Sequence, residues 1–178
     1  MNTPRLQPDP APDGMARGCG HLVEIVNESG VRLAAAPIRR AVFSVFSLCS
    51  VASGQICVLL TSDEAVRELN RVYRGLDEAT DVLSFPCAPM PGMSSCSLGD
   101  LAIAVPTAGR QAGARGVSLL DEVCLLAIHG TLHLLGYEDE SDEDRDRMQG
   151  AMSRAAATAG LAGGSDWTSL HHAGEASE

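Results

Sequence analysis

Two histidines that could hold a metal ion, His129 and His133, lie four residues apart in the apolar segment 119–135. Because an α-helix has 3.6 residues per turn, both imidazoles would project from one face of a helix and reach one ion. Gly136 follows and would let the chain reverse, which makes Asp139 the natural third ligand. The residues alone leave two interpretations open, a metal site and a pair of hydrogen-bonded core histidines.

Two further residues of this segment bear on its chemistry. The common zinc-protease helix motif has a glutamate directly after its first histidine as general base, whereas this chain has Gly130 there. Ordinary peptide hydrolysis would therefore lack its usual base. Glu122 lies two turns before His129 on roughly the same helix face and could orient an imidazole. The pattern favours a simpler interpretation, in which Glu122 is a solvated acid in the first turn of the helix.

The elements that position these residues are predicted from periodicity and capping residues. Four segments have the apolar pattern of strands, and five have the spacing and caps of helices. The strands are expected at 21–27, 55–61, 82–85 and 98–105. The helices are expected at 37–50, 62–75, 106–115, 118–136 and 141–159. The sequence thus predicts an α/β domain in which about five helices pack against one small four-stranded sheet, with the histidines on the central helix.

The two ends of the chain lack this periodicity. Residues 1–18 are rich in Pro, Asp and Gly, and residues 158–178 mix Ala, Gly, Ser and His around the lone Trp167. We expect a disordered N-terminal segment (1–18), a single domain (19–157) and a flexible C-terminal tail (158–178).

Composition excludes several classes of protein. Aromatic residues make up only 3% of the chain, which leaves few stacking platforms for nucleic acid. No apolar stretch reaches the roughly 20 residues of a membrane span, and residues 1–18 do not resemble a signal peptide. An unexported, cytoplasmic protein is expected. Its six cysteines form no Cys-x-x-Cys pair and are predicted to be free thiols.

The charge is unevenly distributed along the chain. The net charge is −10, and all thirteen basic residues are arginines. Residues 138–178 hold 10 acids and 3 arginines, a net of −7, so the acidity is mainly C-terminal. A cleft in the first part of the chain could still use arginines to bind phosphate, because a guanidinium pairs with phosphate oxygens at fixed geometry.

At this point the motifs become recognisable as those of a family. The segment HGTLHLLGYED at 129–139 resembles the H-G-x-L-H-L-x-G-Y-D-H signature of the YbeY family of metal-dependent endoribonucleases. Two further blocks match in the same order, LNRVYRGLD with TDVLSFP at 69–86 and LGDLAI at 98–103. The resemblance covers about residues 21–155.

The resemblance implies a small mixed sheet with packed helices and one metal ion, usually zinc, held by three histidines beside a cleft. In this chain the third histidine position is occupied by Asp139. Zinc accepts a carboxylate oxygen at about 2.0–2.2 Å, so binding is expected to survive the exchange. The carboxylate lowers the positive charge of the site and could shift its preference toward harder divalent ions. Glu138 and Glu140 are possible substitutes that stand out of register.

Other residues acquire roles only through the resemblance. Arg74 aligns with the family's Y-R arginine, which is implicated in activity, and a guanidinium suits the extra negative charge of a phosphate transition state. Without the resemblance, Arg74 is an ordinary surface arginine at a helix end. Asp81, Ser84 and Asp100 lie in the matching blocks, and for them hydrogen bonding at turns and strand ends is the favoured interpretation.

The function implied is that of a hydrolase, a single-strand-specific endoribonuclease in ribosomal RNA maturation, particularly at the 3′ end of the small-subunit RNA, and in ribosome quality control. The expected partners are ribosomal RNA and the small ribosomal subunit with its proteins, but neither a membrane nor DNA. Two alternatives remain open. One is a ribosome-assembly factor whose metal is mainly structural, suggested by the seven acids in residues 138–146. The other is a different metal-dependent hydrolase.

Overall fold

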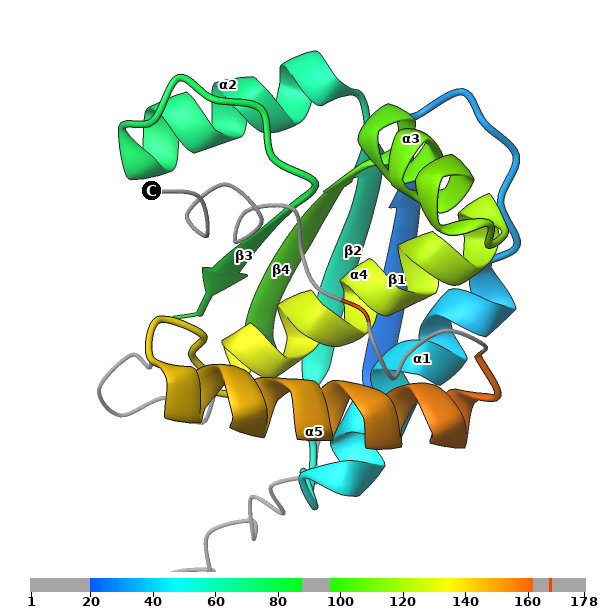
Figure 1. Ribbon diagram of the computed structural model, residues 1–178, viewed down its shortest axis with the longest axis vertical. Helices are drawn as coiled ribbons and strands as arrows, with labels where there is room; N and C mark the ends of the chain where they lie inside the picture. The colour runs from blue at the N-terminus through cyan, green and yellow to red at the C-terminus, as the bar shows by residue number, and fades with distance from the viewer. Residues whose placement is uncertain (1–19, 88–96, 162–166, 168–178) are drawn as a thin grey trace, which may run out of the picture.

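The computed structural model describes residues 20–87, 97–161 and 167, and the elements of this part follow the predicted order (Figure 1). They are β1 (Leu22–Asn27), α1 (Ala35–Leu48), β2 (Gln55–Thr61), α2 (Asp63–Arg74), β3 (Val82–Pro86), β4 (Ser97–Ala104), α3 (Val105–Arg115), α4 (Leu119–Leu134) and α5 (Asp142–Ala159). The four strands and five helices lie within about two residues of the expected ranges, which confirms the predicted fold class.

Three helices begin at the serine caps that the sequence indicates. The hydroxyls of Ser62, Ser118 and Ser141 each accept a hydrogen bond from the backbone N–H three residues further on. Such caps satisfy N–H groups that have no partner inside the helix. The largest shift from the prediction is in α1, which begins two residues before Pro37. Pro37 fits there because the first N–H groups of a helix have no intrahelical acceptor.

The four strands form one mixed sheet in the order β1-β2-β4-β3. Strand β2 is parallel to both β1 and β4, whereas β3 is antiparallel to β4 and forms the edge. The mixed sheet implied by the family resemblance is therefore present.

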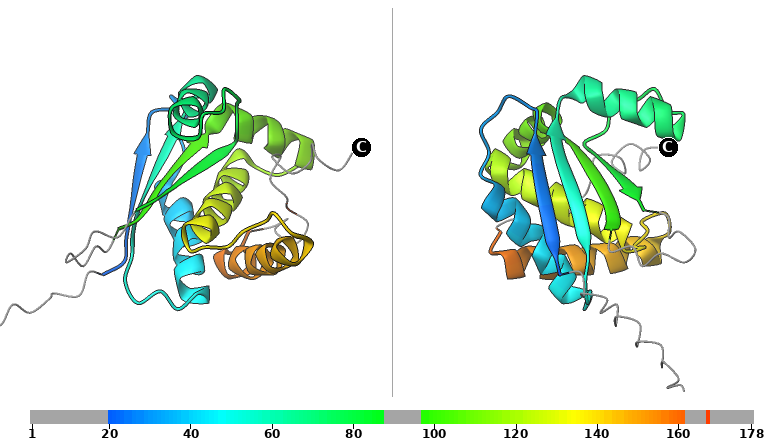
Figure 2. Two further views of the ribbon diagram at one scale, coloured as in Figure 1. Left: turned by 90° about the vertical axis from the view of Figure 1, so that its left-hand side faces the viewer. Right: turned by 180° about the vertical axis from the view of Figure 1, so that it is seen from behind.

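The helices divide between the two faces of the sheet. Helices α1, α3, α4 and α5 lie on one face, and α2 lies across β3 and β4 on the other (Figures 1 and 2). Side chains alternate accordingly, because successive residues of a strand point to opposite faces. Leu101 and Ile103 of β4 enter the main core, while Ala102 and Ala104 pack under Val66 of α2.

Helix α4 is the centre of the fold. It packs against α1, α3, α5, β3 and β4, and every residue from Glu122 to Leu132 is buried. This environment explains why its sequence is apolar almost all round. In the described part of the chain, no single helix is long and apolar enough to cross a membrane. Only α3 and α4 taken together, bent by 112°, meet those criteria.

The predicted tails lie mostly outside the described residues, as does all of 1–18. Of the expected C-terminal tail (158–178), the structure describes only residues 158–161 and Trp167. Helix α5 continues to Ala159, and the side chain of Trp167 is buried, with 2% of its surface exposed.

Three of the cysteines predicted to be free thiols are free in the structure, namely Cys49, Cys57 and Cys124, and a fourth, Cys87, is exposed. The other two, Cys19 and Cys96, lie outside the described residues.

Candidate metal centre

The structure brings His129, His133 and Asp139 together. The Nε2 atoms of the two histidines are 3.1 Å apart, and Oδ2 of Asp139 lies 3.8 Å from Nε2 of His129 and 3.4 Å from Nε2 of His133. His129 and Asp139 are buried, with 6% and 8% of their surfaces exposed, and His133 is partly buried. Two nitrogens and one carboxylate oxygen thus converge on one point.

These spacings fit a small divalent ion. Zinc bonds of about 2.0–2.1 Å at tetrahedral angles place neighbouring ligand atoms about 3.3 Å apart. The three separations in the structure, 3.1, 3.4 and 3.8 Å, bracket that value. The donor set is also one that zinc accepts, and a tetrahedral ion would keep one position for water or substrate. The residues present therefore fit the single divalent ion that the family resemblance implies.

The end of α4 explains how Asp139 reaches the histidines. Gly136 has φ of +83°, a left-handed conformation that favours glycine. The N–H of Tyr137 donates to the carbonyl of Leu132, and the N–H of Gly136 donates to that of His133, so the chain turns back over the last helical turn. Arg145 of α5 then holds the loop by donating to the carbonyl of Asp139 at 3.3 Å.

Burial distinguishes Asp139 from the two glutamates beside it. Glu138 and Glu140 are both exposed, whereas Asp139 is buried beside the histidines. The structure thus places the residue predicted to be in register, and neither neighbour, in the cluster.

Close packing explains the glycine that follows His129. A Cβ atom at Gly130 would lie 2.8 Å from Cδ2 of Leu101 and 3.2 Å from Oγ of Ser84. Because α4 lies this close to β3 and β4, the position has no room for the glutamate of the zinc-protease motif. The Ser84 hydroxyl uses the proximity to donate to the carbonyl of Gly130 at 3.2 Å.

Arg74 lies outside the histidine cluster, and two hydrogen bonds through strand β3 link it to helix α4. It is the exposed last residue of α2, and its Nη2 donates to the carbonyl of Ser84 at 3.5 Å. Ser84 in turn bonds Gly130, the residue next to His129. The structure therefore connects Arg74 to the histidine helix through one strand residue, Ser84 of β3.

The two aspartates of the matching blocks lie elsewhere. Asp81 is buried, where its Oδ1 accepts from the N–H of Val82 and its Oδ2 from Nε2 of Gln111. That is the strand-end hydrogen bonding that was favoured from the sequence. Asp100 is exposed on β4 and lines a different hollow.

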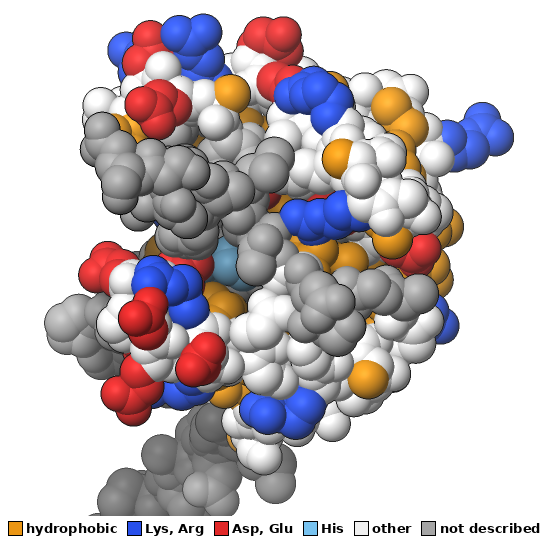
Figure 3. Space-filling model, in the orientation of Figure 1, with side chains coloured by type: hydrophobic (Ala, Val, Ile, Leu, Met, Phe, Trp, Pro, Cys, Tyr) orange, Lys and Arg blue, Asp and Glu red, His pale blue; other side chains and the backbone are white. Residues whose placement is uncertain are grey.

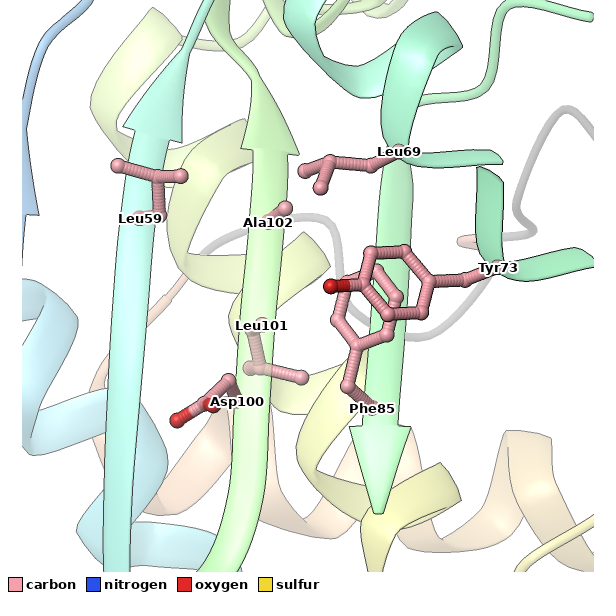
Figure 4. Close-up of a pocket in the computed structure, with 7 residues that line it drawn as sticks. All are labelled: Leu59, Leu69, Tyr73, Phe85, Asp100, Leu101 and Ala102. Carbon is pink, nitrogen blue, oxygen red and sulfur yellow. The ribbon is translucent and has the colours of Figure 1, made fainter. Parts of the chain in front are cut away.

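This hollow lies on the sheet face opposite α4 and has a volume of about 310 Å³ (Figure 4). The ring of Tyr73 crosses that of Phe85 there, with centroids 5.2 Å apart. It is lined by Leu59, Leu69, Tyr73, Phe85, Asp100, Leu101 and Ala102. Helix α4, which carries the histidines, packs on the other face, so the sheet separates this hollow from the histidine cluster.

The acidic segment at residues 138–146 borders the candidate metal centre. A histidine side chain is visible in a hollow beside acidic and basic side chains that gather over the start of α5 (Figure 3). Part of this acidic charge is paired, because Arg145 bonds Asp142 and Arg147 lies 3.0 Å from Asp144. The histidine cluster thus lies beside a surface that carries both acidic and basic side chains.

The prediction that Glu122 is a solvated acid is wrong. Its side chain is fully buried, and its Oε1 accepts hydrogen bonds of 2.9 Å from Arg115 and from the indole N–H of Trp167. Burial raises the pKa of the Glu122 carboxyl, while the bond from Trp167 and the charge of Arg115 act in the opposite direction. An acid in a helix that is apolar on all sides was the available signal, because such a residue must be paired.

Trp167 is a second residue that sequence reasoning missed. Its ring lies 5.1 Å from the ring of His129, centroid to centroid, at 57°. No sequence period links residue 167 to residue 129, and only the lone tryptophan in a polar, glycine-rich segment hinted at an anchoring role.

Comparison with known proteins identifies the family. A family model described as Endoribonuclease YbeY matches residues 31–160. A Thermus thermophilus protein named Endoribonuclease YbeY is 41% identical over 135 residues, covering 75% of this chain and 97% of the relative. A Moorella thermoacetica protein of the same name is 43% identical over 116 residues, covering 60% and 74%.

A solved structure has the same fold. The solution structure of a Thermotoga maritima protein covers 76% of this chain and 89% of its own, with a TM-score of 0.51 and 23% sequence identity. The family match over residues 31–160 includes the three sequence blocks, and the sheet is mixed, as the family resemblance implies. The chain therefore belongs to the YbeY endoribonuclease family.

Proposed function

We propose that this protein is a metal-dependent endoribonuclease that cleaves single-stranded RNA and acts in the cytoplasm on ribosomal RNA, at the 3′ end of the small-subunit RNA. The observation that carries the proposal is the convergence of two imidazole nitrogens and one carboxylate oxygen within 4.8 Å of one another, in a chain that belongs to an endoribonuclease family.

His129, His133 and Asp139 would hold the ion, for which we propose zinc. A bound divalent ion supplies Lewis-acid polarisation of a phosphoryl oxygen. The carboxylate makes the set less positive than three histidines would be, so this site is expected to accept harder divalent ions more readily.

Arg74 is proposed to bind the scissile phosphate. Its guanidinium is exposed, carries donors in a planar fork that matches phosphate oxygens, and is attached to β3 through the carbonyl of Ser84. In that position it can stabilise negative charge that develops on the phosphate. Gly130 removes the usual base of zinc peptidases, which favours a phosphodiester over a peptide as substrate.

The acidic surface supports a second candidate, an assembly factor that binds the small ribosomal subunit and cleaves naked RNA poorly. Asp142 and Glu143 are exposed at the start of α5, next to the loop that carries Asp139. Their charge would repel free RNA but would suit a basic ribosomal protein.

The test is cleavage of a labelled single-stranded RNA by the purified, metal-loaded chain, with a duplex of the same sequence for comparison. Loss of cleavage in both His133→Ala and Arg74→Ala, with activity retained in the exposed neighbour Glu140→Gln, is the expected result. Undiminished cleavage in both site variants would remove the mechanism and indicate a contaminating nuclease. Co-sedimentation with small subunits without cleavage of naked RNA would favour the assembly factor.

A further inference from the structure

Trp167 occupies an unusual place in this chain. It is the only tryptophan, it lies beyond the residues 31–160 that match the family model, and its side chain is 2% exposed. Its ring contacts His129, one of the three candidate metal ligands, with 5.1 Å between ring centroids. A residue outside the family domain thus touches the candidate metal centre.

Two charged residues hold the indole in this position. The indole N–H donates to Oε1 of Glu122 at 2.9 Å, and Nη1 of Arg115 donates to the same oxygen at 2.9 Å. The guanidinium of Arg115 also lies over the indole ring, 5.0 Å from its centroid. Hydrogen bonds to a buried carboxylate are strong and directional. The bond from the indole N–H to Glu122 therefore fixes the orientation of the buried ring.

The placement of these groups on α4 relates them to the candidate metal centre. Glu122 and His129 are seven residues apart, which is about two helical turns, so they lie on the same side of α4. Trp167 contacts both residues. Its indole N–H donates a hydrogen bond to Glu122, and its ring packs on the ring of His129. A ligand imidazole must be held in one orientation for its nitrogen to point at the ion, and that restraint usually comes from a neighbouring group.

We propose that Trp167, held by Glu122 and Arg115, is a positioning residue for His129, so that the chain beyond the family domain completes the metal centre. The inference rests on the proposed function, because it presumes that the histidine cluster binds an ion. A purely structural role for Trp167 is the alternative. In that case the ring only covers core surface, and its replacement would leave the metal affinity unchanged.

The first test uses the lone tryptophan as a reporter. Bound Co²⁺ is paramagnetic and quenches tryptophan emission over short distances, so one equivalent should quench most of the emission of the full chain. His133→Ala, which removes a ligand whose ring packs on His129, should abolish the quenching. If one equivalent binds and the emission is unchanged, the inference fails. If no ion binds at all, the proposed metal centre fails instead.

The second test asks whether the indole influences the ion. Trp167→Leu is compared with Phe46→Leu, a control that also replaces a buried ring by leucine but whose ring contacts are with His21 and Phe43. We expect Trp167→Leu to weaken Zn²⁺ affinity about 10-fold, measured by chelator competition, and to shift the visible absorption bands of bound Co²⁺. Phe46→Leu should lower the melting temperature and leave both readouts unchanged.

A milder variant keeps the inference testable if Trp167→Leu does not fold. Trp167→Phe retains a ring against His129 and loses only the N–H that Glu122 accepts, so its affinity loss should be smaller than that of the leucine variant. Wild-type Zn²⁺ affinity and a wild-type Co²⁺ spectrum in every folded Trp167 variant would overturn the inference.

Discussion

The carboxylate of Asp139 lies 3.4 Å from Nε2 of His133, although the end of α4 and a reversal of the chain separate the two residues. This contact places an oxygen where a histidine nitrogen is expected from the family signature. It therefore makes the identity of residue 139 the most direct test of the candidate metal centre.

Asp139→Ala is expected to release the metal, because one of three ligands is lost. Asp139→His should restore a three-nitrogen set and preserve or raise the affinity for Zn²⁺. Affinity is measured by chelator competition, with bound metal counted by elemental analysis. The exposed neighbours Glu138 and Glu140 provide matched controls, and their alanine variants should keep the ion. Retention in Asp139→Ala together with loss in either control would show that the register is wrong.

Arg74→Ala is expected to slow RNA cleavage about 100- to 1,000-fold without releasing the metal, because Arg74 acts on the phosphate and is no part of the ligand cluster. Arg74→Lys should recover only part of the rate, since lysine lacks the planar fork. Single-turnover cleavage and metal content are measured on the same samples. Arg71→Ala is the control, an arginine on the same helix that pairs with Glu68. Equal losses of rate in the two alanine variants would contradict a specific role.

Gly99→Ala should destabilise the fold by about 2 kcal/mol or more, and Gly113→Ala should stabilise it by about 0.5–1 kcal/mol. Gly99 has φ of +140°, and a Cβ there would clash with the carbonyl oxygen of Phe85. Gly113 lies within α3, where nothing is within 4 Å of an added Cβ. Urea unfolding gives both changes in free energy. A neutral Gly99→Ala would mean that β3 and β4 are less closely packed than the structure shows.

The thiols of Cys124 and Cys87 should differ sharply in reactivity. Burial, followed by the charge of Asp121, raises the pKa of Cys124 to about 12, whereas Cys87 is exposed. At pH 8 only about one Cys124 in ten thousand would be a thiolate, the reactive form. Alkylation followed by peptide mass spectrometry should therefore label Cys87 and spare Cys124 in the folded protein, and should label both in urea. Equal labelling in the folded protein would contradict the placement of Cys124 in the core.

The local sequence determines much of the fold and two of the three ligands of the candidate metal centre. Serine caps, terminal glycines and apolar periodicity act within one or two turns of chain, so they predict α2, α4 and α5 to within a residue or two. The i, i+4 spacing of His129 and His133 likewise needs only a helix to bring both imidazoles to one side.

The tertiary structure decides the rest, because it depends on contacts between residues far apart in sequence. Gly136 permits the reversal that brings Asp139 to the cluster, but the burial of Asp139 and the exposure of Glu138 and Glu140 depend on how the loop packs. Glu122 looks like a surface acid until Arg115 and Trp167 enclose it. Periodicity reports which face of an element is apolar and carries no information on which distant residue covers that face, so the contact of Trp167 with His129 emerges only when the chain is folded.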